Sequence, residues 1–245
     1  METNMTGLKQ GIVIFEDENV VSILNGFKSP SSNRKTGEML QQTNMFKHEK
    51  PVEAARNHKD ETVCGTCPHR WFSPDPNADR SCYVNLGQQV TSVWNAWQRG
   101  SYAPITDKEV YKDAMKSGVV INNLRFGAYG NPSVMPVDVV DEWIEASNGH
   151  TGYMHDWKDK PEYAGRFQAS VDSVEEYHEA KDLGFNTFRI DGTTDGRPMK
   201  GETLCINTAK PSIKCIDCML CDGKSRDIYN HTHGSRKNRF KLSVA

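Results

Sequence analysis

The sequence lacks any apolar run close to the roughly 20 residues that are needed to cross a lipid bilayer. Its first ten residues also lack the basic-then-apolar pattern of a secretory signal. The formal net charge is −2 and the pI about 6.4, so no overall basic field favours nucleic-acid binding. We therefore expect a cytoplasmic protein, without a membrane partner, whose thiols stay reduced.

Three common catalytic signatures are missing as well. The chain has no Gly-x-x-x-x-Gly-Lys phosphate loop, no Gly-x-Ser-x-Gly elbow and no His-Glu-x-x-His motif. P-loop ATPases, serine hydrolases and zincins therefore have no sequence support here. The balanced charge has one local exception, a basic C-terminal tail that contains Arg236, Lys237, Arg239 and Lys241. Such a tail is usually solvated, and contact with nucleic acid is the alternative.

Helical and strand patterns alternate from residue 87 onward. We expect strands at 119–126, 150–157, 167–171, 185–190 and 202–207, and helices at 90–100, 106–118, 136–147 and 173–184. A repeated strand–loop–helix unit is typical of an α/β fold with a mostly parallel sheet. The number of units fits an open or partial (β/α) barrel better than a closed eight-fold one.

The two ends of the chain have different patterns. Residues 1–62 are expected to form a hairpin or two edge strands at 11–27 and then an irregular stretch, with a short helix at 36–42. Residues 63–207 are expected to form the α/β partial-barrel domain. Residues 208–245 are expected to form an irregular, Cys-rich, metal-binding appendage that ends in the basic tail.

The seven cysteines fall into two groups. The first group is Cys64, Cys67 and Cys82, and the second is Cys205, Cys215, Cys218 and Cys221. Two residues between cysteines let both sulfurs turn toward one centre, as in zinc sites and iron–sulfur clusters. An odd number of cysteines with this spacing indicates ligation rather than a disulfide framework.

The two groups differ in the number of ligands that they offer. The second group supplies a complete set of four thiolates, for which His231 or His233 is a substitute ligand. The first group supplies three, and its fourth ligand is His69, His58 or a small molecule. Structural zinc sites are closed, whereas catalytic sites keep a position open. Both groups are therefore candidate metal sites, with reduced buried thiols as the alternative.

Several motifs resemble a set of uncharacterised bacteriophage proteins of similar size. They are Arg34-Lys-Thr-Gly37, Cys64-Gly-Thr-Cys67-Pro-His-Arg70, Cys82-Tyr-Val84, Gly127-Ala-Tyr-Gly-Asn-Pro132, Thr151-Gly-Tyr-Met-His155, Ala169-Ser-Val-Asp-Ser173 and the final four-cysteine group. This resemblance covers most of the chain and implies no activity. If the chain is phage-encoded, its compartment is the host cytoplasm.

A more distant resemblance is to radical S-adenosylmethionine enzymes, which have a partial (β/α) barrel. It implies a [4Fe–4S] cluster on the first group, S-adenosylmethionine at a strand-end loop, and an auxiliary cluster on the second group. The loop residues are Gly127, Tyr129, Gly130, Asn131 and Pro132. The spacing Cys-x2-Cys-x14-Cys differs from that family's usual Cys-x3-Cys-x2-Cys. The resemblance also requires the first group to lie beside this loop.

Polar residues at strand ends are candidate catalytic groups. His155 and Asp172 follow expected strands, and Asp191 follows the next one. A capped strand end, a helix cap and a turn are the respective structural alternatives. Arg125 and Arg189 lie in apolar strands, where each needs an anionic partner, either a substrate carboxylate or phosphate, or Asp172 or Asp191.

Three functions remain open from the sequence. The first is a radical-SAM-like enzyme that acts on a small molecule or nucleotide. The second is a zinc-stabilised barrel that modifies nucleic-acid bases in the manner of a transglycosylase, with Asp172 or Asp191 as nucleophile. The third is a non-enzymatic zinc protein that binds a host factor. Bound iron, with [4Fe–4S] and S-adenosylmethionine as cofactors, distinguishes the first from the two Zn²⁺ alternatives.

Overall fold

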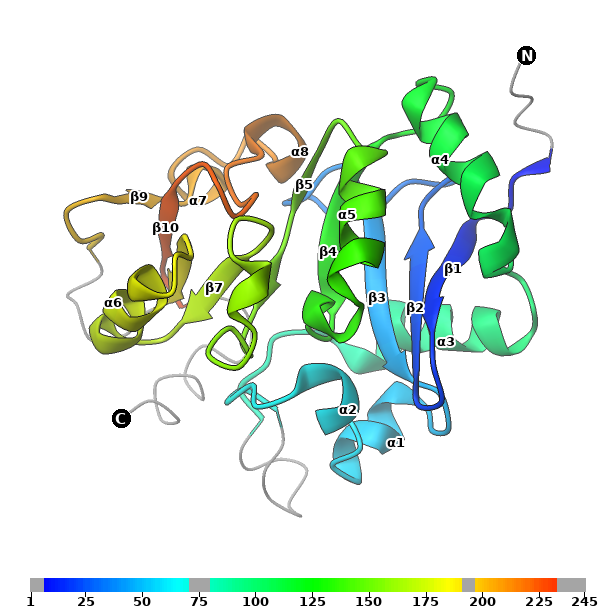
Figure 1. Cartoon of the computed structure of the whole chain (residues 1–245), viewed down its shortest axis with the longest axis horizontal. Coiled ribbons are helices and arrows are strands. Elements are labelled where there is room, and N and C mark those ends of the chain that lie inside the picture. Colours follow the sequence, from blue (N-terminus) through cyan, green and yellow to red (C-terminus); the bar gives the residue numbers. More distant parts are fainter. Residues whose placement is uncertain (1–6, 71–79, 191–196, 233–245) are drawn as a thin grey trace.

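The computed structural model describes residues 7–70, 80–190 and 197–232 of the chain. These residues form a mixed α/β fold with two five-stranded sheets, in the orders β1-β2-β3-β4-β5 and β6-β7-β8-β10-β9 (Figure 1). The first sheet contains β1 (Gly11–Glu16), β2 (Val20–Asn25), β3 (Leu40–Phe46), β4 (Asn123–Tyr129) and β5 (Gly149–Thr151). The second contains β6 (Tyr153–Met154), β7 (Gln168–Val171), β8 (Thr187–Ile190), β9 (Glu202–Leu204) and β10 (Asp227–Asn230).

Eight α-helical segments lie between the strands in this part of the chain. They are α1 (Pro51–Arg56), α2 (Glu61–Cys64), α3 (Thr91–Gln98), α4 (Lys108–Lys116), α5 (Val137–Glu145), α6 (Val174–Asp182), α7 (Ile206–Ala209) and α8 (Cys215–Cys218). Short 3-10 turns cover Ile105–Asp107, Pro132–Val134 and Pro161–Tyr163, and a π-helical turn covers Leu86–Val90. The expected hairpin and all four expected helices are confirmed. At α6 the expected cap is present, because the Glu176 N–H donates to Ser173 Oγ at 3.1 Å.

The strands are mostly parallel, as expected. The β1–β2 and β2–β3 pairs are antiparallel, and the other pairs in both sheets are parallel. Gly152 alone separates β5 from β6, where its N–H donates to the Cys221 carbonyl and its carbonyl accepts from Gln168 N–H, both at 3.0 Å. A Cβ at this position would lie 2.5 Å from the Phe167 ring. A residue without a side chain therefore joins the two sheets.

Strand β4 buries alternate residues under a helix. Leu124 and Phe126 of β4 belong to the main hydrophobic core, together with Val140 and Trp143 of α5, which covers this face (Figure 1). Because strand side chains alternate, the residues between them point to the opposite face. That opposite face forms the candidate site described below.

The predicted helix at 36–42 is wrong, because residues 40–46 form β3, an inner strand of the first sheet. Its polar side chains do not form the apolar or alternating pattern from which a strand is predicted. Gln42 and Asn44 are buried, yet both are hydrogen-bonded: Gln42 Oε1 accepts from Gly127 N–H at 2.8 Å, and Asn44 Nδ2 donates to the Asn131 carbonyl at 2.8 Å. Buried polar groups that find partners remain compatible with a sheet interior.

The segment from residue 208 onward differs in part from the expected irregular appendage. Its residues Asp227–Asn230 form β10, which lies between β8 and β9 inside the second sheet. Ile228 and Tyr229 are buried there. A four-residue strand carries too short a pattern to be distinguished from a loop by its sequence.

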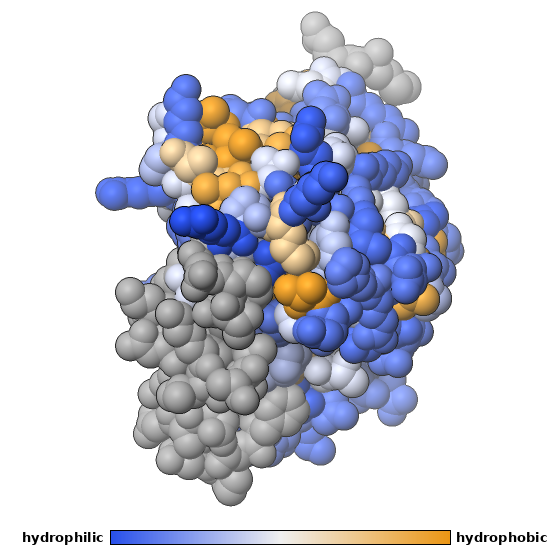
Figure 2. Space-filling view, turned by 90° about the vertical axis from the view of Figure 1, so that its left-hand side faces the viewer, coloured by the Kyte–Doolittle hydropathy of each residue, from blue (hydrophilic) through white to orange (hydrophobic). Residues whose placement is uncertain are grey.

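The described helices are all too short or too polar to cross a bilayer. Figure 2 shows the side that carries α6 and β9, where the surface is mainly hydrophilic and apolar residues form small groups.

Candidate metal centre in a cysteine-lined cavity

A cavity of about 510 Å³ lies on the face of the sheets opposite the core helices. Six strands contribute residues to its wall, and where a strand contributes more than one, these are alternate residues. They are Arg125, Gly127 and Tyr129 of β4, Thr151 and Tyr153 of β5 and β6, Ser170 of β7, Phe188 and Ile190 of β8, and Ile228 and Asn230 of β10. Tyrosines and aliphatic side chains make most of this wall apolar, which is typical of small-molecule sites.

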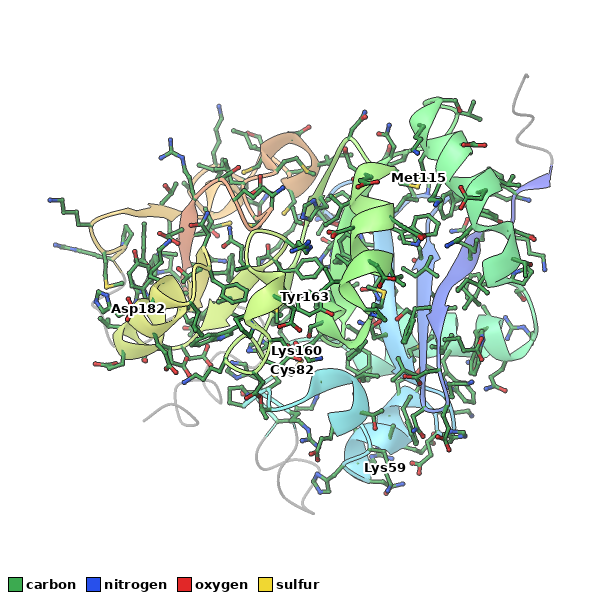
Figure 3. The ribbon with its side chains drawn as sticks, in the orientation of Figure 1. Lys59, Cys82, Met115, Lys160, Tyr163 and Asp182 are labelled. Carbon is green, nitrogen blue, oxygen red and sulfur yellow. The ribbon has the colours of Figure 1, made fainter. Side chains whose placement is uncertain are left out.

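All seven cysteines line this one cavity, although they come from distant parts of the sequence. All seven are free thiols. Cys67 is buried and the other six are partly exposed to the cavity. Figure 3 places Cys82 near the centre of the molecule, beside the segment that carries α2. The two groups predicted from spacing therefore share one internal space.

The first group is assembled by backbone hydrogen bonds. Cys64 ends α2, and the Cys67 N–H donates to the Cys64 carbonyl at 3.2 Å, which folds the Cys-x-x-Cys segment into a turn. The Cys82 N–H donates to the His69 carbonyl at 2.9 Å. This contact brings Cys82 back toward Cys64 and Cys67, although fourteen residues separate it from Cys67 in the sequence.

The loop at 127–132 lies directly beside this group. The Asn131 N–H donates to the Val63 carbonyl at 2.7 Å, and its Nδ2 donates to the Cys64 carbonyl at 2.9 Å. Its Oδ1 accepts from the His155 N–H at 3.1 Å. Asn131 thus uses its polar atoms to position Cys64 and His155. The proximity that the resemblance requires is present.

Gly127 and Gly130 both have positive φ, at 65° and 75°. Gly127 lies in a bulge of β4, where the pairing register with β3 shifts between Gln41 and Thr43. At Gly130 a Cβ would lie 2.9 Å from the Asn44 Cβ and 3.0 Å from the Val63 carbonyl oxygen. Strand β3 and α2 therefore approach the loop as closely as a glycine permits. Pro132, the last residue of the predicted loop, is buried at the start of a 3-10 turn.

Gly130→Ala is expected to destabilise the chain. The positive φ costs about 1–2 kcal/mol for any L-residue, and the overlap with the Val63 backbone adds about 1–3 kcal/mol. Gly165→Ala is the matched control, because Gly165 has φ 78° and open space around its Cα. Urea unfolding of both variants checks this. Equal losses of stability would show that the close approach at Gly130 has no energetic importance.

The second group is held by the segment before β3, by β10 of the second sheet and by the strand junction at Gly152. The Cys215 N–H donates to the Lys35 carbonyl at 2.9 Å, and the Cys205 N–H donates to the Tyr229 carbonyl at 2.8 Å. Cys221 is fixed by the bond from Gly152 described above. Lys35 belongs to the stretch that was expected to be irregular, so the sequence gives no sign of this contact apart from the Arg34-Lys-Thr-Gly37 motif.

A tyrosine accompanies each group. Tyr129 of β4 lies beside the Cys64 thiol and Tyr153 of β6 beside the Cys221 thiol, and each tyrosine lowers the pKa of its cysteine. Both tyrosines are cavity residues on the same sheet face. Tyr153 was not singled out by the sequence, because a tyrosine in a short strand has an ordinary packing role. Only the alternation across the sheet places it beside a cysteine.

Burial raises the pKa of the Cys64 and Cys67 thiols in the first group, and of Cys215 and Cys221 in the second. Neighbouring cysteines raise these pKa values further, because adjacent thiolates repel each other. Arg125 acts in the opposite direction on the pKa of Cys215. A bound metal ion supplies the positive charge that such thiolates need, and its binding releases their protons.

The spacing of the sulfurs bears on the kind of metal. Across the described ranges, three ligand atoms of His, Cys, Asp or Glu lie within 4.8 Å of one another at His69, His155 and Asp172, and no trio of cysteine sulfurs is that compact. Tetrahedral zinc holds its sulfurs about 3.8 Å apart, given Zn–S bonds of about 2.3 Å. An iron–sulfur cubane is wider, because each thiolate binds a different iron. No three of the cysteine sulfurs therefore stand at the spacing of a single tetrahedral zinc ion in this structure.

His69 lines the cavity and lies between the side chains of Ser81 and Asp172. Its Nδ1 shares a hydrogen bond with Ser81 Oγ at 2.8 Å, and its Nε2 lies 3.0 Å from Asp172 Oδ2. Ser81, His69 and Asp172 are all buried. Both ring nitrogens of His69 therefore contact Ser81 and Asp172 rather than the first cysteine group. His69 does not supply the fourth ligand of that group in this arrangement.

His155 follows β6 and stacks edge-to-face on His69, with ring centroids 5.3 Å apart. Burial, with a smaller contribution from His69, lowers the pKa of His155 to about 4. Asp172 follows β7 and does not cap α6, since Ser173 has that role. The structure thus brings together two of the three predicted catalytic residues. The third, Asp191, lies outside the described residues, as does His233.

The structure also shows partners of three other residues that the sequence singled out. Arg189 pairs with Glu202 rather than with Asp172, and Arg125 Nη1 donates to Gln41 Oε1 at 3.3 Å. His231 Nδ1 lies 3.4 Å from the Tyr229 hydroxyl. Glu202 was missed because a carboxylate in a short strand gives no sign that it is buried.

No family model, curated protein or solved structure matches this chain.

Proposed function

We propose that this chain is an iron–sulfur enzyme that binds a small-molecule cofactor and its substrate in the cysteine-lined cavity. The observation that carries the proposal is the convergence of all seven cysteines on one cavity of about 510 Å³. Structural zinc staples are usually closed and separate from ligand pockets. Here both groups border a space that is large enough for a ligand.

The proposed architecture is a partial (β/α) barrel whose interior is the cavity. Alternate residues of neighbouring strands line it, as they line the interior of a barrel. His155 and Asp172 follow the carboxyl ends of β6 and β7, and ligands of parallel α/β folds bind at that end.

The first cysteine group is proposed to hold a [4Fe–4S] cluster, with S-adenosylmethionine beside it. Three thiolates leave one iron open, and the bound cofactor would supply radical chemistry. The chain's own contribution is positioning: Gly127 and Gly130 allow close backbone approach, and Asn131 ties the loop to Cys64. The second group is proposed to hold an auxiliary cluster.

The substrate is proposed to carry a negatively charged group. Arg125 and Lys35 border the cavity on the side of Cys215, and both lower the pKa of that thiol. A phosphate or carboxylate would find its cationic partners there. A nucleotide or a nucleic-acid base fits this description, and contact with nucleic acid through the basic tail belongs to the same proposal.

The first test is the metal content and absorption spectrum of protein purified without oxygen. We expect a brown protein with a broad band near about 400 nm, acid-labile sulfide, and about eight irons per chain. The iron-loaded protein is then incubated with S-adenosylmethionine and a reductant, and cofactor cleavage is measured. A colourless protein with one or two zinc ions per chain would refute the iron–sulfur proposal and favour a zinc-stabilised protein.

A further inference from the structure

A second set of possible metal-ligand side chains, separate from the cysteines, lies at the edge of the cavity, where two of its three members line the wall. His69, His155 and Asp172 each offer a ligand atom, and these atoms lie within 4.8 Å of one another. They come from three parts of the chain: the segment after α2, the end of β6 and the end of β7. Their convergence is tertiary, since His69 and Asp172 are 103 positions apart.

We propose that His69, His155 and Asp172 bind one divalent metal ion, of the zinc or ferrous class, at the wall of the cysteine-lined cavity. Two imidazoles and one carboxylate form a ligand set that these ions favour. The His69 Nε2 and Asp172 Oδ2 atoms lie 3.0 Å apart. That separation is close to the edge of a coordination sphere with metal–ligand bonds of about 2.0–2.1 Å.

The surroundings of His69 support this assignment. Ser81 Oγ holds the remaining ring nitrogen of His69 at 2.8 Å. Ligating histidines almost always have such a partner on their second nitrogen, because it fixes the orientation of the ring. Asp172 is also held by its backbone, whose N–H donates to Glu176 Oε2 at 2.8 Å.

His155 distinguishes a metal site from a simple ion pair. An ion pair needs His69 and Asp172 only, yet the His155 ring packs against His69 on the same wall. In the described part of the chain, neither ring nitrogen of His155 has a hydrogen-bond partner from the protein. A metal ion in the middle of the three side chains would engage it.

The ligand of this metal would come from the cavity. Three protein ligands leave at least one coordination position open in a zinc or ferrous site. His69 and His155 both border the cavity, so an oxygen donor on a molecule bound there, either water or a substrate hydroxyl or carboxylate, can take that position. The inference does not depend on which metal the cysteines hold.

Cobalt(II) binding by the full-length, anaerobically purified protein tests the site. A nitrogen–oxygen site gives weak visible bands, whereas thiolate ligation adds intense near-ultraviolet charge transfer. We expect one equivalent of Co²⁺ with the weak bands, and a loss of affinity of about 10-fold or more in His155→Gln and Asp172→Asn. His48→Gln is the matched control, because His48 is an exposed histidine far from the cavity walls.

Melting temperatures with and without Co²⁺ distinguish a loss of metal binding from a loss of folding. Added Co²⁺ should raise the melting temperature of the wild type and of His48→Gln, and leave that of His155→Gln unchanged. Asp172→Asn keeps a hydrogen bond to His69. If His155→Gln fails to fold, the Co²⁺ affinity of Asp172→Asn tests the site instead. Equal Co²⁺ affinity in all variants, or a purely thiolate spectrum, would overturn the site. Iron and sulfide contents are measured separately, so this inference and the proposed function can fail independently.

Discussion

Cys82→Ala and Cys218→Ala are each expected to lose about half of the iron, falling from about eight to about four atoms per chain. Each substitution removes one thiolate from a different group, and the loss of a ligand should release the cluster on that side of the cavity. Both cysteines are only partly buried, so neither change leaves a large internal void. Iron and sulfide analysis after anaerobic purification measures the effect.

Each variant serves as the control for the other. Cofactor cleavage should disappear in Cys82→Ala, because the first group lies beside the loop at 127–132, and should persist at least in part in Cys218→Ala. A different result, in which either substitution removes all the iron, would mean that the seven cysteines hold a single shared centre. Because both groups border the same cavity, that outcome is a clear alternative.

Glu202→Gln is expected to cost about 3–5 kcal/mol of unfolding free energy, which is a large part of the stability of a domain. Arg189 Nε and Nη2 donate to the two oxygens of Glu202 at 2.7 and 2.6 Å, and both side chains are 0% exposed. The pair links β8 to β9 across β10, where the Arg189 guanidinium lies 4.7 Å from the Tyr229 ring centroid. The amide removes the negative charge that faces the buried Arg189 guanidinium.

Glu179→Gln is the control for this substitution. Glu179 pairs with Lys158 at 2.8 Å, and the two side chains are 51% and 45% exposed. Solvent screening limits such a pair to about 1 kcal/mol or less. Urea unfolding followed by circular dichroism compares the two variants. If both lose the same small amount, the Arg189–Glu202 pair does not hold the strands of the second sheet together.

Local sequence patterns were sufficient for the elements whose stability is local. The hairpin of β1 and β2 has two short apolar runs separated by a polar turn, and α6 begins at a Ser-x-x-Glu cap. Alternating strand and helix patterns indicated a mostly parallel sheet. The two cysteine groups were also evident, because cysteines with two residues between them are typical of metal ligands.

Three features depended on contacts that no local pattern encodes. Strand β3 is polar, and it is buried only because Gln42 and Asn44 find partners near the 127–131 segment. Strand β10 is short, and it is stabilised by β8 and β9 on either side. The Arg189–Glu202 pair crosses a strand that enters the sheet later in the sequence.

The candidate site shows the same division. Sequence patterns singled out the seven cysteines, in two groups, as candidate metal ligands, and His155 and Asp172 at strand ends as candidate catalytic residues. The tertiary structure alone decided that both cysteine groups border one cavity and that His69 lies 3.0 Å from Asp172. The physical reason is that strand order and register bring together residues far apart in the chain, and these depend on the packing of the whole sheet rather than on the preference of any one segment.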